Sequence, residues 1–198
     1  GHSWGANLGL MFAAKFPERL SHLIVLGTAP LTQELENRLG QSMMNRISAD
    51  TQMQLTQVDD QIRNLLTKAP ESKHSETLHS LAQQRLALID SAYHCNPDTS
   101  QYIPSCSFDF RGFIASKTSL WELIENDEIP QLLQQIQAPV TAFHGETDVI
   151  PCDGTLGFLK NHIGHVQTHR IADAGHFIWL EPQARTTVLN QLRTALDS

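Results

Sequence analysis

The sequence begins with GHSWGANLGL at residues 1–10, and its first five residues decide how the rest is interpreted. Ser3 has one glycine two positions before it and another two positions after it, Gly1 and Gly5. Small residues at these positions let the backbone turn sharply from a strand into a helix and expose a serine at the corner. The alternative is an ordinary glycine-rich turn, and the two interpretations make different predictions downstream.

The residues after this pentapeptide favour the sharp corner. Within residues 6–16, Leu8, Met11 and Phe12 recur at helical intervals, which predicts a buried helix. Residues 23–26, LIVL, are a short continuous apolar run, typical of a parallel strand that is covered on both faces. A helix directly after Ser3 is the context that an exposed serine of this kind requires.

The last third of the chain alternates between helical and strand-like segments. The segments are a helix at 131–136, a strand at 140–143, a helix at 155–161, a strand at 166–171 and a helix at 183–196. Such alternation predicts an α/β fold with a mostly parallel sheet and crossover helices.

The middle of the chain has a different amino-acid composition. Residues 31–128 are polar and rich in glutamine, and their apolar residues, such as Val58 and Ile62, recur at helical spacing. We expect a helical cap over the strand ends, inserted into a core formed by residues 1–30 and 129–198. A surface that binds a partner is the alternative for this segment.

Two loops that follow predicted strands carry candidate catalytic groups. Asp148 lies in HGETDVIP at residues 144–151, at the edge where open α/β sheets place their sites. A turn aspartate that caps the next segment is the alternative, and Glu146 and Asp153 are rival acids. His176 lies in DAGHF, and histidine is the usual base for a serine because it titrates near neutrality. An exposed loop histidine is the alternative there.

The order of these residues along the chain carries more information than any one of them. Ser3, then Asp148, then His176 is the order of nucleophile, acid and base in α/β-hydrolases. GHSWG, HGETDVIP and DAGHF resemble the three motifs of that family. Trp4, after the serine, is similar to the proline iminopeptidase branch, and FDFRGF at residues 108–113 resembles the end of a cap there.

This resemblance implies a fold and a reaction. The fold would be the C-terminal part of an α/β-hydrolase with an inserted helical cap. Ser3 would attack the carbonyl of a small ester or amide substrate, His176 would take and return the proton, and Asp148 would orient the ring. The backbone N–H of Trp4 would stabilise the oxyanion. The alternative function is a non-catalytic hydrolase-like scaffold, or one half of a split protein that needs an upstream segment.

The sequence departs from the family pattern at one point. The family places several strands, and the loop with a second oxyanion donor, before the nucleophile, and no such residues precede Gly1 here. We therefore expect the backbone of Gly1 and His2 to lack support, and residues 23–26 to present an unpaired edge that invites self-association. The isolated chain would then be a poor catalyst.

Charge and composition exclude other classes of function. Fourteen basic and 21 acidic residues give a formal charge of −7, and the basic residues are scattered, so we expect no nucleic acid partner. No apolar run approaches the roughly 20 residues that span a bilayer, so we expect no membrane partner. The three cysteines, Cys95, Cys106 and Cys152, are too few for a disulfide framework, which favours a reducing, cytoplasmic location.

The histidines at 162, 165 and 169 could be imagined as a metal site. Gly164 would break a helix that aligned them, and no acidic residue or cysteine lies close by in the sequence. We therefore expect neither a metal nor another cofactor.

Overall fold

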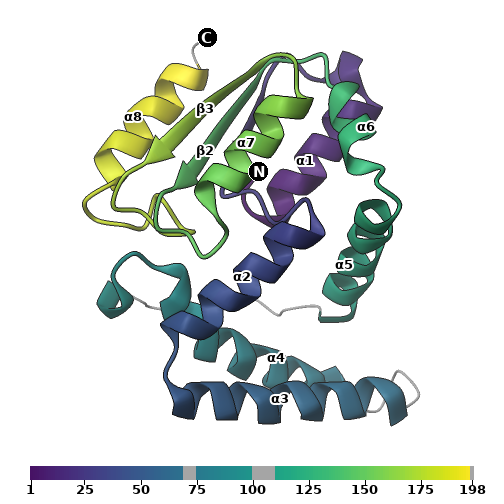
Figure 1. Cartoon of the computed structure of the whole chain (residues 1–198), viewed down its shortest axis with the longest axis vertical. Coiled ribbons are helices and arrows are strands. Elements are labelled where there is room, and N and C mark those ends of the chain that lie inside the picture. Colours follow the sequence, from purple (N-terminus) through teal and green to yellow (C-terminus); the bar gives the residue numbers. More distant parts are fainter. Residues whose placement is uncertain (69–74, 100–109, 197–198) are drawn as a thin grey trace.

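The computed structural model describes residues 1–68, 75–99 and 110–196. Its sheet has three parallel strands in the order β1-β2-β3 (Figure 1), which are β1 (Leu23–Leu26), β2 (Val140–Gly145) and β3 (Val166–Ile171). Leu23 pairs with Val140, and Val140 pairs with Val166, so the strands start level with one another. The predicted α/β fold with a parallel sheet is confirmed.

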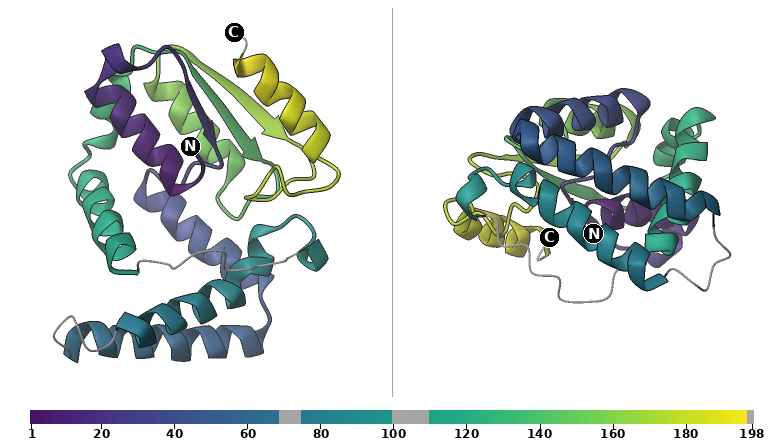
Figure 2. Two further views of the ribbon diagram at one scale, coloured as in Figure 1. Left: turned by 180° about the vertical axis from the view of Figure 1, so that it is seen from behind. Right: turned by 90° about the horizontal axis from the view of Figure 1, so that it is seen from below.

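Helices cover both faces of this sheet (Figure 2). Strand residues alternate between faces, so Val25 and Ala142 join one apolar cluster and Phe143 joins another. The first cluster holds α1 (Trp4–Lys15), α6 (Ile129–Gln134) and α7 (Cys152–His162), and the second holds α8 (Arg185–Leu196). This two-sided burial explains why β1, LIVL, is a continuous apolar run.

Between β1 and α6 the described residues form helices joined by loops, with no strand. They are α2 (Gln33–Arg46), α3 (Ala49–Lys68), α4 (Ser75–Ile89), the short 3₁₀ helices η2 (Asp90–Tyr93) and η3 (Pro97–Thr99), and α5 (Phe110–Glu125). In Figures 1 and 2 these helices lie beyond the carboxyl ends of the strands. Helices α3 and α4 pack on each other through a cluster that includes Val58, Ile62 and Leu78.

The backbone of the first three residues is paired with β1, so the expectation that it lacks support was wrong. The amino group of Gly1 donates to the Ile24 carbonyl at 2.9 Å, and Leu26 N–H donates to the Gly1 carbonyl at 2.9 Å. Ser3 N–H donates to the Leu26 carbonyl at 3.0 Å, and His2 forms a parallel bridge with Leu26. The edge of β1 that was expected to be unpaired is therefore paired with the residues that lead into α1. That helix begins at Trp4, two residues before the predicted start.

Within the part of the chain that the structure describes, no helix combines the length and apolar composition needed to cross a bilayer.

The end of β2 leaves no room for a side chain at Gly145. A Cβ there would collide with the carbonyl oxygens of Ala174 and Gly175, which belong to the loop after β3. Because backbone atoms cannot swing away, we expect Gly145→Ala to lower the free energy of unfolding by about 1–3 kcal/mol. Urea denaturation followed by circular dichroism measures this loss.

Gly157→Ala in α7 is the matched control. A Cβ at Gly157 would meet no described atom within 4 Å, so the same substitution should raise stability by roughly 0.5–1 kcal/mol through helix propensity. Equal stabilities of the two variants would contradict the steric argument at Gly145.

Candidate active site

Ser3 sits at a strained corner between its pairing with β1 and the first turn of α1. Its φ of 53° and ψ of −120° lie in a region that residues other than glycine rarely adopt. Hydrogen bonds on both sides of Ser3 hold this strained conformation. Ser3 N–H donates to the Leu26 carbonyl of β1, and the Ser3 carbonyl accepts Ala6 N–H at 3.0 Å. Sharp, strained turns of this kind present a serine side chain away from the backbone.

The two glycines that flank Ser3 differ in how much room the turn leaves for a side chain. A Cβ on Gly1 would collide with the Gly5 carbonyl and lie 2.9 Å from Ala6 Cα. A Cβ on Gly5 would meet no described atom within 4 Å. The expectation that both positions need small residues therefore holds for Gly1 and is wrong for Gly5.

Asp148 is buried just after β2 and collects hydrogen bonds on both carboxylate oxygens. Oδ1 accepts Ile150 N–H at 2.9 Å, and Oδ2 accepts His176 Nδ1–H at 2.8 Å. Burial alone would raise the pKa of Asp148, but the charge and hydrogen bond of His176 outweigh it and hold that pKa below its usual value. Asp148 is therefore an anion that faces His176.

His176 is held in the loop after β3 by contacts on its backbone and its ring. Its N–H donates to the Tyr93 carbonyl of η2 at 2.7 Å, and its carbonyl accepts His2 Nε2–H at 3.1 Å. The rings of His2 and Tyr93 lie 4.6 and 5.1 Å from its own. Burial lowers the pKa of His2 to about 4, so His2 is a neutral neighbour.

Glu181 ties the same loop to the helical segment. Its side chain is fully buried, and Oε1 accepts the N–H of Gly175 at 3.3 Å and the N–H of Cys95 at 2.7 Å. His94 Nδ1 lies 3.8 Å from that oxygen. Sequence reasoning missed Glu181, because a lone glutamate before a helix gives no signal until its burial is known.

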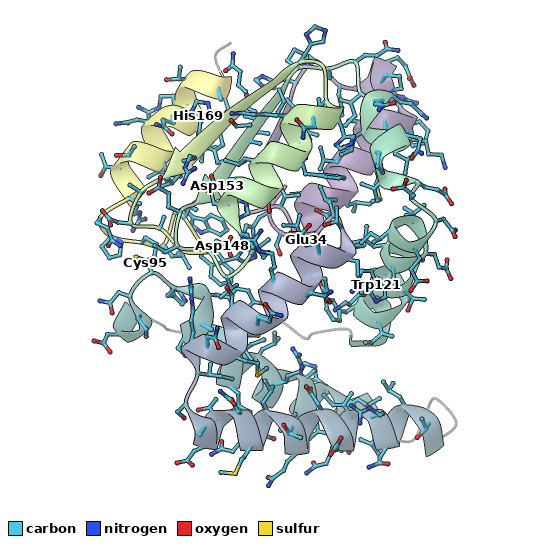
Figure 3. The ribbon with its side chains drawn as sticks, in the orientation of Figure 1. Glu34, Cys95, Trp121, Asp148, Asp153 and His169 are labelled. Carbon is cyan, nitrogen blue, oxygen red and sulfur yellow. The ribbon has the colours of Figure 1, made fainter. Side chains whose placement is uncertain are left out.

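The rival acids have other partners. Arg170 on β3 donates to Glu146 Oε1 at 3.1 Å and also pairs with Asp153 on α7, both at the exposed surface. Figure 3 labels Asp148 near the carboxyl ends of β2 and β3, with Asp153 at the start of α7. Of the three candidate acids, Asp148 is the one hydrogen-bonded to His176.

Ser3 and His176 both line a cavity of about 270 Å³ between the sheet and the helices. Its other walls are mainly apolar and include Leu39, Met43, Tyr93, Leu120, Trp121 and Ile150. Asp148 does not line this cavity, and instead borders a separate polar cavity of about 360 Å³. The structure thus places Ser3 and His176 at the same cavity and Asp148 outside it.

The charged residues of the apolar cavity are paired. Lys117 of α5 donates to Glu36 of α2 at 2.7 Å, and Arg85 of α4 donates to Asp59 of α3 at 2.8 Å. The wall therefore offers little net charge to a bound molecule.

The backbone N–H of Trp4 lies at the N-terminus of α1. As the first residue of the helix, Trp4 has no residue four positions earlier in the helix to accept its N–H. Trp4 also lines the cavity that Ser3 lines. The donor predicted for an oxyanion is thus next to the candidate nucleophile.

Two of the three histidines considered for a metal site have other ring contacts. His162 Nδ1 donates to the Phe158 carbonyl at 2.8 Å, and the His169 ring stacks on Phe143 at 4.6 Å. Among residues 1–68, 75–99 and 110–196, no group of three or more histidine, cysteine, aspartate or glutamate side chains is arranged to hold a metal ion. Cys106 and the first two residues of the FDFRGF motif lie outside the described residues.

The chain is similar to several solved structures at low identity. It aligns with 2-hydroxy-6-oxo-6-phenylhexa-2,4-dienoate hydrolase from Rhodococcus sp. strain RHA1 at 15% identity and a TM-score of 0.51, covering 100% of this chain and 63% of that one. Cfl2 of Burkholderia cenocepacia aligns at 18% and 0.57, covering 98% and 63%. A monoacylglycerol lipase of Paleococcus ferrophilus aligns at 14% and 0.55, covering 97% and 64%.

The chain thus spans about three fifths of the length of these structures, and at such identities the likeness shows the fold. No curated protein matches the sequence. A sequence model described as alpha/beta hydrolase fold matches residues 1–183, which is most of the chain. With its parallel sheet and the strained serine corner before α1, the chain belongs to the α/β-hydrolase family.

Proposed function

We propose that this protein is a serine hydrolase that cleaves an ester or amide bond of a small, mainly apolar substrate through an acyl-enzyme. The observation that carries the proposal is the 2.8 Å bond from His176 to Asp148 at the wall of a cavity that Ser3 also lines. A histidine fixed by a buried carboxylate beside a strained serine is the arrangement that nucleophilic catalysis uses.

The reaction follows from which nitrogen of His176 is free. Nδ1–H is committed to Asp148, so Nε2 is the basic nitrogen that accepts the proton of Ser3 Oγ. Oγ attacks the substrate carbonyl carbon, and Trp4 N–H donates to the oxygen that becomes negative. The protonated His176 gives its proton to the leaving alcohol or amine. Water then repeats the sequence on the acyl-enzyme and regenerates Ser3.

The cavity favours an apolar group next to the scissile bond. Its charged residues form ion pairs. Its aromatic and aliphatic walls favour binding of an apolar group, because they remove the apolar surface of that group from water. Because α2 and α5 contribute most of these walls, we infer that residues 31–128 act as the cap that selects the substrate, while Ser3 and His176 come from the core.

The comparisons support the reaction class without specifying the substrate. Members of the α/β-hydrolase family are generally hydrolases, and the similar structures include proteins described as a serine hydrolase and a monoacylglycerol lipase. An esterase and an aminopeptidase would both use the chemistry above, so both kinds of substrate belong in the assay.

The central test is the reactivity of Ser3. We expect a fluorophosphonate probe to label the protein at Ser3, and Ser3→Ala to lose both the label and any turnover of p-nitrophenyl butyrate or an aminoacyl arylamide. Removing such a nucleophile typically costs roughly 10⁶-fold in turnover. Intact-protein mass spectrometry detects the adduct, and peptide mapping locates it.

Ser21→Ala is the control, because Ser21 is an exposed serine outside the cavity that Ser3 lines. It should leave labelling unchanged. A parent protein that the probe does not label would contradict the proposal and favour a non-catalytic scaffold.

The choice of acid gives a second prediction. Asp148→Asn removes the charge that faces His176 and lets the ring take the wrong tautomer, so turnover should fall on the order of 10⁴-fold. Glu146→Gln and Asp153→Asn alter carboxylates that pair with Arg170 at the surface, and should change turnover less than about twofold. A larger loss in either surface variant than in Asp148→Asn would reassign the acid.

The role of the helices gives a third prediction. Trp121→Ala on α5 enlarges the apolar cavity without altering Ser3, His176 or Asp148, so it should raise KM for p-nitrophenyl hexanoate by about tenfold, equivalent to roughly 1.4 kcal/mol of lost binding. The rate of fluorophosphonate labelling at Ser3 should stay within about twofold of the parent. Steady-state kinetics with acetate, butyrate and hexanoate esters measures the change in preference. An equal loss on all three esters would count against α5 as a selector.

A further inference from the structure

His144 is a buried histidine that the reaction above does not use. It lies on β2, its side chain is fully enclosed, and it precedes Asp148 by four residues. Its Nε2 is 3.0 Å from the Ile150 carbonyl oxygen and 3.2 Å from Asp148 Oδ2. Asp148 therefore has a histidine on each side, His144 from the strand and His176 from the loop.

The position of the proton on His144 follows from these neighbours. A carbonyl oxygen only accepts hydrogen bonds, so the Nε2 that lies against Ile150 must carry the hydrogen. Asp148 Oδ2 lies 3.2 Å from the same nitrogen. The other nitrogen, Nδ1, is buried without a partner among the described residues, and burial lowers the pKa of His144. The ring therefore stays neutral with a fixed tautomer.

We propose that His144 is a positioning residue for the acid: a permanently neutral N–H donor that shares Asp148 Oδ2 with His176 and thereby limits how strongly that oxygen holds the His176 proton. This inference rests on the proposed function, because it assigns a role within the Ser3–His176–Asp148 arrangement.

The geometry gives His144 two effects. Ile150 N–H and His176 Nδ1–H donate to the carboxylate, and His144 Nε2 lies 3.2 Å from Oδ2, so groups from three positions limit its rotation. Each donor also stabilises negative charge on the oxygens, so removing one makes the Asp148–His176 pair bind its proton more tightly. A change at His144 should therefore move the titration of the pair to higher pH.

Three other titratable groups near Asp148 do not change their charge in the pH range of this titration. Burial raises the pKa of Tyr93 to about 12 and that of Cys152 to about 11, and burial lowers the pKa of His2 to about 4. These three groups are neutral from pH 5 to 9. The charged residues Glu146, Asp153, Arg170 and Arg38 face Asp148 across the polar cavity, where Arg170 pairs with both carboxylates.

The test is nuclear magnetic resonance of protein labelled with ¹⁵N-histidine, titrated from pH 5 to 9. His144 in the parent should show the neutral Nε2–H pattern throughout. His144→Phe keeps a ring but removes the N–H group 3.2 Å from Asp148 Oδ2, and should move the midpoint of the His176 resonance up by about 0.5–1 pH unit, as expected for losing one polar donor beside a charged group.

His144→Gln supplies an amide N–H in a similar place and should return the midpoint to within about 0.2 pH units of the parent. His169→Phe changes a histidine on β3 that stacks on Phe143 and should leave the midpoint in place. A purely structural role for His144 would lower the melting temperature of His144→Phe without moving the midpoint.

The outcomes separate this inference from the proposed function. A protonated His144, an Nδ1–H tautomer, or equal midpoints in the parent and His144→Phe would overturn the positioning role, whether or not Ser3 reacts. If His144→Phe does not fold, the tautomer of His144 in the parent still tests the role, and a His144→Gln midpoint that departs from that of the parent would also overturn it. Absence of fluorophosphonate labelling at Ser3 would instead overturn the hydrolase, and the resonance measurements need no turnover.

Discussion

The parallel pairing on both sides of β1 is the constraint on which the rest of the structure depends. On one side β1 holds the backbone of Gly1 and Ser3, and on the other it is in register with β2, which is in register with β3. Parallel strands in register end at the same edge, so the turns after them are brought together. The strained serine, the loop with Asp148 and the loop with His176 meet because four separate segments share one hydrogen-bonded ladder.

A buried carboxylate would be costly at this edge without nearby donors. Asp148 is almost fully enclosed, and transfer of an isolated charge from water into such a place carries a penalty of several kcal/mol. The N–H of Ile150 and the ring of His176 offset that penalty by hydrogen bonding to the anion, and His144 Nε2 lies 3.2 Å from Oδ2. The site is therefore stabilised by the same contacts that orient its groups. Removing one of these contacts would leave part of the burial penalty of Asp148 without compensation.

The order of elements and the candidate triad were readable from the sequence because both leave local signals. Apolar residues marked β1 and the start of β2, and Ser3 and His176 each lie within two residues of a glycine. The support of Gly1 by β1 was not readable, because it depends on pairing between segments more than twenty residues apart. Glu181 and His144 were missed for a related reason. Their importance comes from burial and from partners contributed by other segments, and neither follows from neighbouring residues.

The attachment of His176 to η2 has a consequence for how this sequence can vary. The acceptor on η2 is the main-chain carbonyl of Tyr93, and Glu181 likewise accepts a main-chain N–H, that of Cys95. Bonds to main-chain atoms survive a change of side chain at those positions as long as the path of the backbone is kept. The side chains of the helices that shape the cavity can therefore change while the hydrogen bond between His176 and η2 is kept.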